Sequence, residues 1–440
     1  MKNWFLEDQE AYSGLVLGGG GARGCYEIGV WKALDEEHLS FDCTAGTSIG
    51  ALVAAMYVQG SLEAMIAFVQ TLKPTAIVSD LFAFPETLGA LVASRKEISS
   101  FLQKYIFDGK GVDISPLKQE LNKMFNWQAF HTSPINYACM TFNVTKRTPQ
   151  AYFKREMTAQ NAQDIILASA SCYPAFPVLK MHGEDYIDGG YWDNVPIDLA
   201  QKMKATKILA VDVQGPGLVL PVDRSQINLF EMKPLLPLGN FLDFSSLSAM
   251  RNLWAGYLET SKAMQTLTGF FYTFECSEIE AIAFWSGYLS FLFSLHRIVF
   301  KSEVMETIAH WVFDYSPSDL SKTLAKDKGS WLLIESLAYV AGLDPYHIWS
   351  VPDFLSHLHQ KLEAFYEKVD DLTDLSTLSS LWGRKDLDKM AIITLFYKNL
   401  SPSPLEASQK LAPFGSAYPG EVALAWTWYF LEVVYGRTKA

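Results

Sequence analysis

A serine stands in a short glycine-flanked segment that could do nucleophilic chemistry. Gly46-Thr47-Ser48-Ile49-Gly50 fits the pattern G-x-S-x-G, between a segment that predicts a strand and one that predicts a helix. A nucleophile at such a tight turn adopts strained backbone angles, and side chains two residues away on either side would clash. Glycine removes that clash, and the first N–H groups of the following helix favour developing negative charge. Ser48 is therefore the candidate nucleophile.

A glycine run ends the first predicted strand and reads Gly18-Gly19-Gly20-Gly21-Ala22-Arg23-Gly24. Consecutive glycines let backbone N–H groups converge on one oxygen atom with no Cβ in the way, as an oxyanion hole requires. Two roles are open for Arg23. It could supply positive potential near the oxyanion or a substrate phosphate, or form a salt bridge that fixes the loop.

The same glycines permit a second interpretation. Gly19, Gly21 and Gly24 form G-x-G-x-x-G, and Asp42 lies 18 residues beyond Gly24, which is close to the fingerprint of dinucleotide-binding proteins. However, the strand that carries Asp42 runs straight into the Ser48 turn, and the fingerprint leaves no role for that serine. We therefore rank dinucleotide binding second.

A nucleophilic serine needs a base. None of the eight histidines sits in a sequence setting that identifies it as the partner of Ser48. Asp188, in Tyr186-Ile187-Asp188-Gly189-Gly190, is a carboxylate at a glycine turn after a short apolar stretch. On its own, this tripeptide is also a common turn signal.

Taken together, these segments resemble the patatin-like phospholipases. That family places a G-G-G-x-[KR]-G loop before a G-x-S-x-G turn and a D-G-[GA] motif, and this chain has Gly19–Gly24, Gly46–Gly50 and Asp188–Gly190 in that order. Residues 168–177 (ASASCYPAFP) look like the family's segment before the aspartate, and Asn194-Val195-Pro196 fits the segment after it. The resemblance covers residues 12–215.

The resemblance implies a Ser–Asp dyad, in which Ser48 attacks an ester carbonyl of a glycerophospholipid or lysophospholipid and Asp188 accepts the proton. It assigns the oxyanion hole to N–H groups of Gly19, Gly20 and Gly21, and implies neither metal nor cofactor. Transfer of the acyl group from the acyl-serine to an alcohol or lysolipid is the alternative reaction. A carboxylate with a pKa of about 3.9 in water is a poor base, so we hypothesise that lipid binding dries the site and raises its basicity.

The elements that must position these residues follow from the first half of the chain, where short apolar runs alternate with helical patterns, as in α/β proteins. We expect strands at 14–17, 41–44 and 207–213 and helices at 25–38 and 49–58. With the resemblance, this predicts a three-layer patatin-like α/β core with a central sheet flanked by helices.

Proline and glycine become frequent after residue 214, and the pattern beyond is almost wholly helical. We therefore predict a catalytic domain at 1–220 and a mostly α-helical C-terminal domain of unassigned role at 221–440. A third hypothesis gives that helical region the main role, as a surface that docks a membrane or a protein. Four aromatic residues near its end are more typical of a core: Trp426, Trp428, Tyr429 and Tyr435.

The composition limits partners and compartment. The 440 residues carry a net charge of −12, which argues against binding to nucleic acid. Five scattered cysteines without a C-x-x-C pair, and no secretory signal in Met1–Tyr12, favour a cytoplasmic protein, with peripheral attachment to a membrane left open. Ala281–Leu295 is free of charge but shorter than the roughly 20 residues of a spanning helix, so we interpret it as a buried helix, with a helix lying on lipid as the alternative. The lipid class, the oligomeric state and any activating protein partner stay open.

Overall fold

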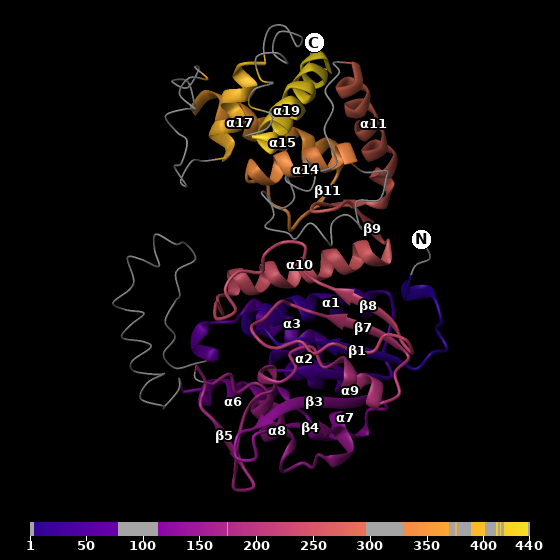
Figure 1. Ribbon diagram of the computed structural model, residues 1–440, viewed down its shortest axis with the longest axis vertical. Helices are drawn as coiled ribbons and strands as arrows, with labels where there is room; N and C mark the ends of the chain where they lie inside the picture. Colours follow the sequence, from indigo (N-terminus) through magenta and orange to yellow (C-terminus); the bar gives the residue numbers. More distant parts are fainter. Residues whose placement is uncertain are drawn as a thin grey trace. The chain divides into compact units, whose positions relative to one another are not determined.

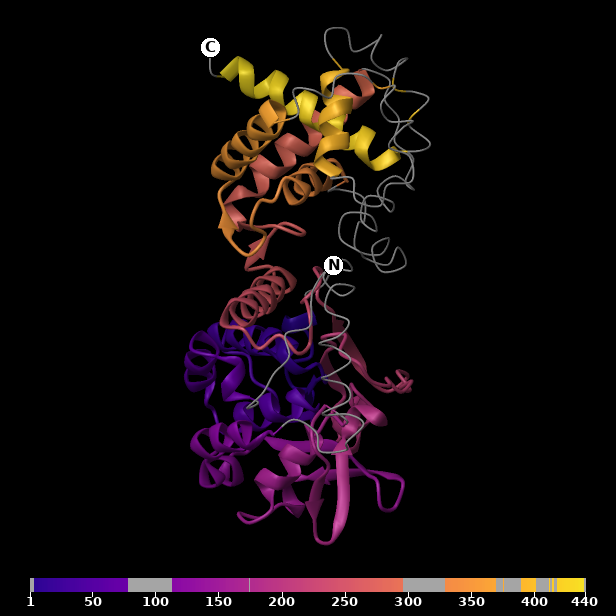
Figure 2. The same ribbon diagram turned by 90° about the vertical axis from the view of Figure 1, so that its left-hand side faces the viewer.

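The computed structural model describes residues 4–77, 113–173, 175–295, 329–368, 375, 389–400, 411, 414 and 418–438. Packing divides the chain into two compact units. The first unit comprises Met1–Pro234 and Leu238–Met264, and the second comprises Leu235–Pro237 and Gln265–Ala440. Figures 1 and 2 show the elements of each unit in two views.

Within the described residues, an eight-stranded sheet forms the centre of the first unit. Five strands run parallel in the order β3-β2-β1-β7-β8, and β4, β5 and β6 add antiparallel pairs. The bounds are Ser13–Leu17 (β1), Cys43–Thr47 (β2), Asn136–Asn143 (β3), Thr148–Phe153 (β4), Leu179–Met181 (β5), Glu184–Asp188 (β6), Lys207–Val211 (β7) and Asn228–Met232 (β8).

Two strands share one edge of β3. Strand β4 pairs along the other edge, whereas β2 pairs with β3 as far as Met140 and β6 takes over at Thr141. Strand β2 ends at Thr47, opposite Met140, and β6 ends at Asp188, opposite Thr141. Two segments far apart in the sequence therefore end at consecutive positions along β3.

Helices cover both faces of the sheet, which makes three layers and confirms the predicted fold class. On one face, α2 (Ile49–Val58) packs on β1, β2 and β3, with α1 (Cys25–Glu36) and α8 (Ala162–Ser169) beside it. On the other face, α9 (Ile197–Lys202) packs on a small-residue surface that includes Val16, Ala45 and Ala210. The remaining helices of this unit are α3 (Leu62–Gln70), α6 (Ser115–Met124), α7 (Trp127–Thr132) and α10 (Ser246–Met264).

The elements predicted around the serine agree closely with the structure, except at one strand. The helix predicted at 49–58 has those bounds as α2, whereas the strand predicted at 41–44 is β2, which begins at Cys43. The Phe41 N–H donates to the hydroxyl of Tyr57 at 3.0 Å, so the ladder starts two residues later. At its other end, strand β2 continues beyond the predicted Thr44 to Thr47, the residue before Ser48.

Helix α10 extends the first unit beyond residue 220. It lies against α1 at two glycines: a Cβ on Gly29 would lie 1.9 Å from the carbonyl oxygen of Leu253, and one on Gly256 would lie 2.0 Å from that of Tyr26. Strand β8 also follows residue 220, and it pairs with β7 in a region where the sequence suggested an almost wholly helical pattern. Such a short edge strand inside a proline-rich segment gives little pattern to detect. The division into domains at 1–220 and 221–440 stays a prediction.

The second unit is mostly helical. Its described helices are α11 (Ile279–Leu295), α14 (Gly329–Val340), α15 (Val351–Lys368), α17 (Lys389–Lys398) and α19 (Pro419–Thr438), with a small sheet of β9 (Leu267–Thr268), β10 (Thr273–Glu275) and β11 (Ile348–Trp349). Trp426 and Trp428 are buried in its core, and Tyr429 is partly buried against it, as core aromatics would be. The side chain of Tyr435 lies outside the described residues.

Helix α11 is only half buried, contrary to the interpretation of residues 281–295 as a buried helix. Leu289 and Leu292 face the core, whereas Phe284, Phe291 and Leu295 are exposed. The sequence does not reveal this because both faces are apolar. Among the residues that the structure describes, we find no helix whose length and hydropathy would let it cross a bilayer.

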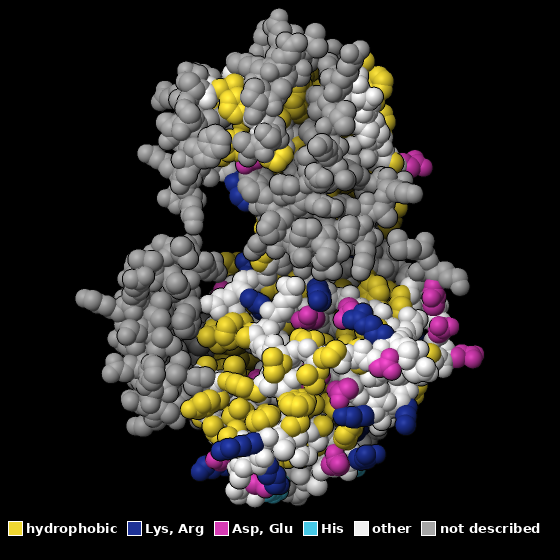
Figure 3. All heavy atoms as spheres, viewed as in Figure 1, with side chains coloured by type: hydrophobic (Ala, Val, Ile, Leu, Met, Phe, Trp, Pro, Cys, Tyr) yellow, Lys and Arg dark blue, Asp and Glu magenta, His cyan; other side chains and the backbone are white. Residues whose placement is uncertain are grey.

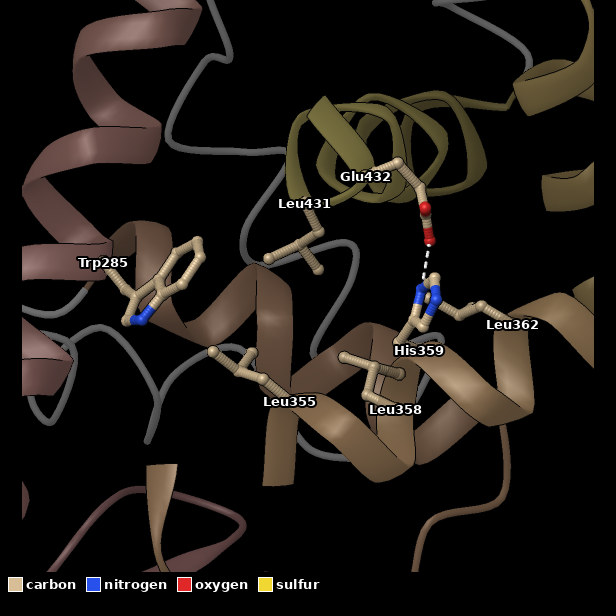
Figure 4. Close-up of a pocket in the computed structure, with 7 residues that line it drawn as sticks. All are labelled: Trp285, Leu355, Leu358, His359, Leu362, Leu431 and Glu432. Atoms are coloured by element: carbon tan, nitrogen blue, oxygen red, sulfur yellow. Dashed lines mark hydrogen bonds and ion pairs between the residues drawn. The ribbon is translucent and has the colours of Figure 1, made fainter. Parts of the chain in front are cut away.

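A pocket lies between α11, α15 and α19 of the second unit (Figure 4). Its walls are Trp285 and four leucines, together with an acid–imidazole pair in which His359 Nδ1 lies 2.7 Å from Glu432 Oε1. The other ring nitrogen, Nε2, lies 3.0 Å from Glu363 Oε1. None of the described residues that line this pocket is a serine, threonine or cysteine.

Candidate active site

Ser48 sits at a strained turn between β2 and α2. Its φ of 58° and ψ of −128° are unusual for a residue with a side chain, and strain of this kind is frequent at functional sites. A Cβ on Gly46 would lie 2.4 Å from backbone atoms of Gly50, and one on Gly50 would lie 2.3 Å from the carbonyl oxygen of Leu17. Both glycines of the pentapeptide are therefore required by the close approach of backbone, as the sequence pattern predicts.

A buried serine from another helix holds the turn in place. The Ser48 N–H donates to Ser169 Oγ at 3.0 Å, and the Ser169 hydroxyl in turn donates to the carbonyl oxygen of Met140 at 2.7 Å. The hydroxyl of Thr47 donates to the carbonyl oxygen of Asp193 at 2.8 Å. The backbone of Ser48 is thus tied to β3 and to the segment that follows Asp188.

Asp188 lies at the end of β6, and its side chain is buried. One carboxylate oxygen accepts the Gly190 N–H at 2.8 Å, and its own N–H donates to the carbonyl oxygen of Ser171. Burial raises the pKa of Asp188 to about 6, although hydrogen bonds from the Ser48 side chain and the Gly190 N–H oppose that rise. A carboxyl with this pKa is a stronger base than one in water and is still ionised at neutral pH.

The glycine run lies beside Ser48, at the carboxyl end of β1. The Gly19 N–H donates to the carbonyl oxygen of Asn194 at 3.0 Å, and Asn194 Nδ2 returns a hydrogen bond to the carbonyl oxygen of Gly19 at 3.0 Å. The N–H of Gly19 is therefore already engaged. Gly20 and Gly21 line the pocket that contains Ser48, so they are the candidate oxyanion donors.

Arg23 binds backbone rather than a carboxylate. Its Nε donates to the carbonyl oxygen of Gly239 at 2.9 Å, and Nη1 donates to that of Gln214. Burial lowers the pKa of Arg23 from its usual value. The guanidinium therefore ties the glycine run to two later loops, and of the two roles open to it, fixing the loop is the one that the contacts support.

One pocket contains the nucleophile and the carboxylate predicted from the sequence. It encloses about 420 Å³ of space, part of it open to solvent. Its walls are Gly20, Gly21, Ser48, Cys172, Ala175, Phe176, Asp188, Asn194, Pro216, Phe241, Leu242 and Phe244. No histidine of the described residues lines it, while His296 and His310 lie outside them. Burial, together with the charge of Asp188, raises the pKa of Cys172 to about 12, so this thiol is a poor nucleophile beside Ser48.

The dinucleotide interpretation requires an acidic side chain at the carboxyl end of the second strand. Asp42 instead precedes β2, and its carboxylate accepts hydrogen bonds from the N–H and the hydroxyl of Ser13, at the start of β1. It therefore lies at the opposite end of the strands from the glycine run. This geometry does not fit the recognition of a ribose bound at that run.

Residues 15–200 match the family model described as patatin-like phospholipase. They form a patatin-like phospholipase domain. Among curated proteins, the lysophospholipase NTE1 of Mycosarcoma maydis is 31% identical over 200 residues, and that of Scheffersomyces stipitis is 29% identical over 200 residues. Each match takes in 46% of this chain, but only 10% and 12% of the two relatives. The chain thus matches about a tenth of the length of these relatives, through its patatin-like domain.

Two solved structures align along most of the chain at low similarity. VipD from Legionella pneumophila has a TM-score of 0.38 and 14% identity, with 96% of this chain and 90% of that chain covered. The type III effector ExoU has a TM-score of 0.30 and 14% identity, with 94% and 77% covered.

The sequence does not single out several residues that the structure places at this site. Ser169 and Asn194 lie in segments that matched the family pattern, but nothing local indicated their contacts with Ser48 and Gly19. Phe241 and Phe244 come from beyond the matched region and reach the pocket only because the chain folds back after β8. No sequence signal for these two is evident.

Proposed function

We propose that the patatin-like domain hydrolyses carboxylic esters of phospholipids or lysophospholipids, with Ser48 as nucleophile and Asp188 as base. One observation carries this proposal: Ser48, held at a strained turn, shares a pocket with a buried carboxylate whose pKa is raised to about 6. The name lysophospholipase of the relatives supports a substrate with one acyl chain. The aromatic and apolar wall formed by Phe176, Phe241, Leu242 and Phe244 suits an acyl chain.

The reaction would proceed in two halves. In the first, Asp188 takes the proton of the Ser48 hydroxyl while Ser48 Oγ forms a bond to the ester carbonyl carbon, and the carbonyl oxygen becomes an oxyanion. Its collapse breaks the ester bond, and the leaving alcohol takes the proton from Asp188. In the second half, Asp188 takes a proton from a water molecule whose oxygen bonds to the acyl carbon. The bond between that carbon and Ser48 Oγ then breaks, Ser48 Oγ takes the proton back from Asp188, and the fatty acid leaves.

Stabilisation of the oxyanion is assigned to the N–H groups of Gly20 and Gly21. Gly19 instead fixes the loop through its paired hydrogen bonds with Asn194, and Arg23 fixes its other end. Donors that are held in place before the reaction stabilise developing charge without reorganisation, and such a donor typically contributes about 100-fold or more in rate. The rigidity of this loop therefore favours catalysis as well as stability.

The test is release of fatty acid from lysophosphatidylcholine and from phosphatidylcholine vesicles, with a chelator present. We expect the wild-type protein to release fatty acid and the Ser48→Ala and Asp188→Asn variants to lose at least about a thousandfold in rate. Added glycerol distinguishes transfer to an alcohol, since it would divert the acyl group into a new ester. The products name the ester position.

Matched controls separate the dyad from general damage. Asp185→Asn changes a carboxylate on the same strand as Asp188, three residues away and outside the pocket, and Ser171→Ala removes a buried hydroxyl that bonds only within α8 and its end. Both should retain most of the activity. Wild-type turnover by Asp188→Asn would exclude Asp188 as the base, and loss on addition of the chelator would exclude metal-independent hydrolysis.

A further inference from the structure

Five exposed apolar side chains border the pocket of the patatin-like domain. They come from two segments, one that follows Asp188 after two glycines and one that follows Pro216 after one glycine, and both Asp188 and Pro216 line the pocket. We call these five residues, which are between 37% and 59% exposed, the apolar rim: Tyr191, Trp192, Leu218, Val219 and Leu220. Large apolar side chains gathered at the mouth of a pocket are unusual on a surface that meets only water.

The two segments of the rim are held together by backbone hydrogen bonds. The Leu218 N–H donates to the carbonyl oxygen of Gly190 at 2.9 Å, and the Asn194 N–H donates to the carbonyl oxygen of Leu218. The Leu220 N–H donates to the buried carboxylate of Asp193 at 3.3 Å. The rim is therefore a built surface, fixed to the turn that carries Asp188.

These pairings also satisfy polar groups that could not be left bare in a lipid environment. An unpaired N–H or carbonyl group costs several kcal/mol in hydrocarbon, so surfaces that enter lipid pair such groups internally. The N–H and the carbonyl oxygen of Leu218 and the N–H of Leu220 meet this condition.

The rim carries no exposed charge. Residues 213–222 contain no charged side chain, and the only one in residues 189–197 is that of Asp193, which is buried. An anionic membrane attracts proteins through lysine and arginine clusters, and the net charge of −12 opposes such attraction. Figure 3 shows one face of the first unit, where hydrophobic side chains gather and charged ones lie mainly around them. Tyrosine and tryptophan beside leucine and valine suit the boundary between headgroups and acyl chains.

We propose that the apolar rim docks the patatin-like domain on the surface of an electrically neutral lipid layer, by insertion of these side chains rather than by charge. The inference rests on the proposed function, because a lipid substrate that leaves the layer must enter the pocket that the rim borders. Docking would bring the mouth of that pocket to the headgroups.

Binding is tested apart from catalysis, on full-length protein in the Ser48→Ala background, so that no lipid is consumed. The measurement is co-sedimentation with phosphatidylcholine vesicles. We expect Leu218→Ser/Val219→Ser to bind at least about tenfold more weakly than its parent, and Trp192→Ser to bind several-fold more weakly, because each change removes buried apolar area. These variants change the two segments of the rim separately, and thermal unfolding identifies any that is not folded.

The control is Leu6→Ser. Leu6 is 64% exposed, much like Leu218. It lies away from the rim, near the amino end of β7, because the ammonium of Lys207 contacts the carbonyl oxygen of the next residue, Glu7. Its replacement should leave vesicle binding unchanged, and binding should persist at about 0.5 M salt, where charge attraction is screened.

Two results would contradict the proposal that the apolar rim docks on lipid. One is vesicle binding by both folded rim variants as tight as that of the parent. The other is parent binding that requires anionic lipid and is abolished by salt. Fatty-acid release tests the proposed function separately. Vesicle binding that depends on the rim, without release by the wild-type protein, would refute hydrolysis and support docking by the rim. Release of fatty acid, with binding that does not depend on the rim, would support hydrolysis and refute docking by the rim.

Discussion

Ser169 Oγ accepts the N–H of Ser48 at 3.0 Å and donates to the carbonyl oxygen of Met140 at 2.7 Å. Met140 is paired with Thr47, and the next residue of β3, Thr141, is paired with Asp188. One buried hydroxyl therefore connects the backbone of Ser48 to the point on β3 where Asp188 is paired. This contact sets the spacing between the members of the proposed dyad.

Removing that hydroxyl should impair catalysis more than folding. We expect Ser169→Ala to lower kcat at least about tenfold with little change in KM, because the strained turn loses its support while the pocket walls remain. The unfolding free energy should fall by about 1–3 kcal/mol, as the Ser48 N–H is left unpaired. Steady-state kinetics and denaturant unfolding measure both. An equal loss of kcat in Ser171→Ala, two residues away, would show that the effect is not specific to Ser169.

The pH dependence of the reaction should follow the ionisation of Asp188. Because its pKa is raised to about 6 and the base must be ionised, kcat/KM for a soluble short-chain ester should rise through pH 6 and level off above it. Burial also raises the pKa of Asp193 to about 6. The profile of Asp193→Asn is therefore the control. If the rise disappears in that variant, the titration does not belong to Asp188.

The same ionisation makes the site a source of instability. From about pH 4 to pH 6 the folded state keeps a proton on Asp188 that the unfolded chain releases, so stability falls as pH rises across that window. A shift of about two pKa units corresponds to about 3 kcal/mol at pH 7 and above. Asp188→Asn removes that penalty and should unfold at a higher temperature than wild type at pH 7.5, with the difference vanishing near pH 4. A lower unfolding temperature at pH 7.5 would contradict this assignment.

The turn should not tolerate a methyl group at Gly50. A Cβ there would lie 2.3 Å from the carbonyl oxygen of Leu17 and 2.6 Å from that of Gly18, and both belong to backbone that leads into the glycine run. We expect Gly50→Ala to cost about 3 kcal/mol of stability and most of the activity. Gly287→Ala, in α11 with no atom within 4 Å of the added Cβ, should be neutral or slightly stabilising. Unfolding curves of the two variants compare the sites directly.

The local part of this arrangement is readable from the sequence. The G-x-S-x-G spacing predicts the clash at Gly46 and Gly50, and the helix at 49–58 follows from its apolar pattern. The same holds for the strand at 14–17, which enters the glycine run. These features depend on neighbours within a few residues, so pattern alone suffices.

The rest depends on contacts between distant segments. The sequence places Asp188 at a turn but gives no sign that β6 takes over the edge of β3 where β2 ends. The family resemblance assigns the N–H groups of Gly19, Gly20 and Gly21 to the oxyanion hole. No local pattern indicates that Gly19 instead pairs with Asn194, 175 positions later. The small sheet of the second unit has strands of two or three residues, too short for an alternating pattern to appear.

The most direct test of the Ser48–Asp188 dyad is the site and rate of covalent labelling by a long-chain fluorophosphonate, followed by peptide mass spectrometry. We predict a single adduct on the peptide that contains Ser48, none in Ser48→Ala, and labelling of Asp188→Asn slowed by at least about a hundredfold, because the hydroxyl then lacks its base. Labelling of another residue, or wild-type labelling of Ser48 in Asp188→Asn, would contradict the dyad.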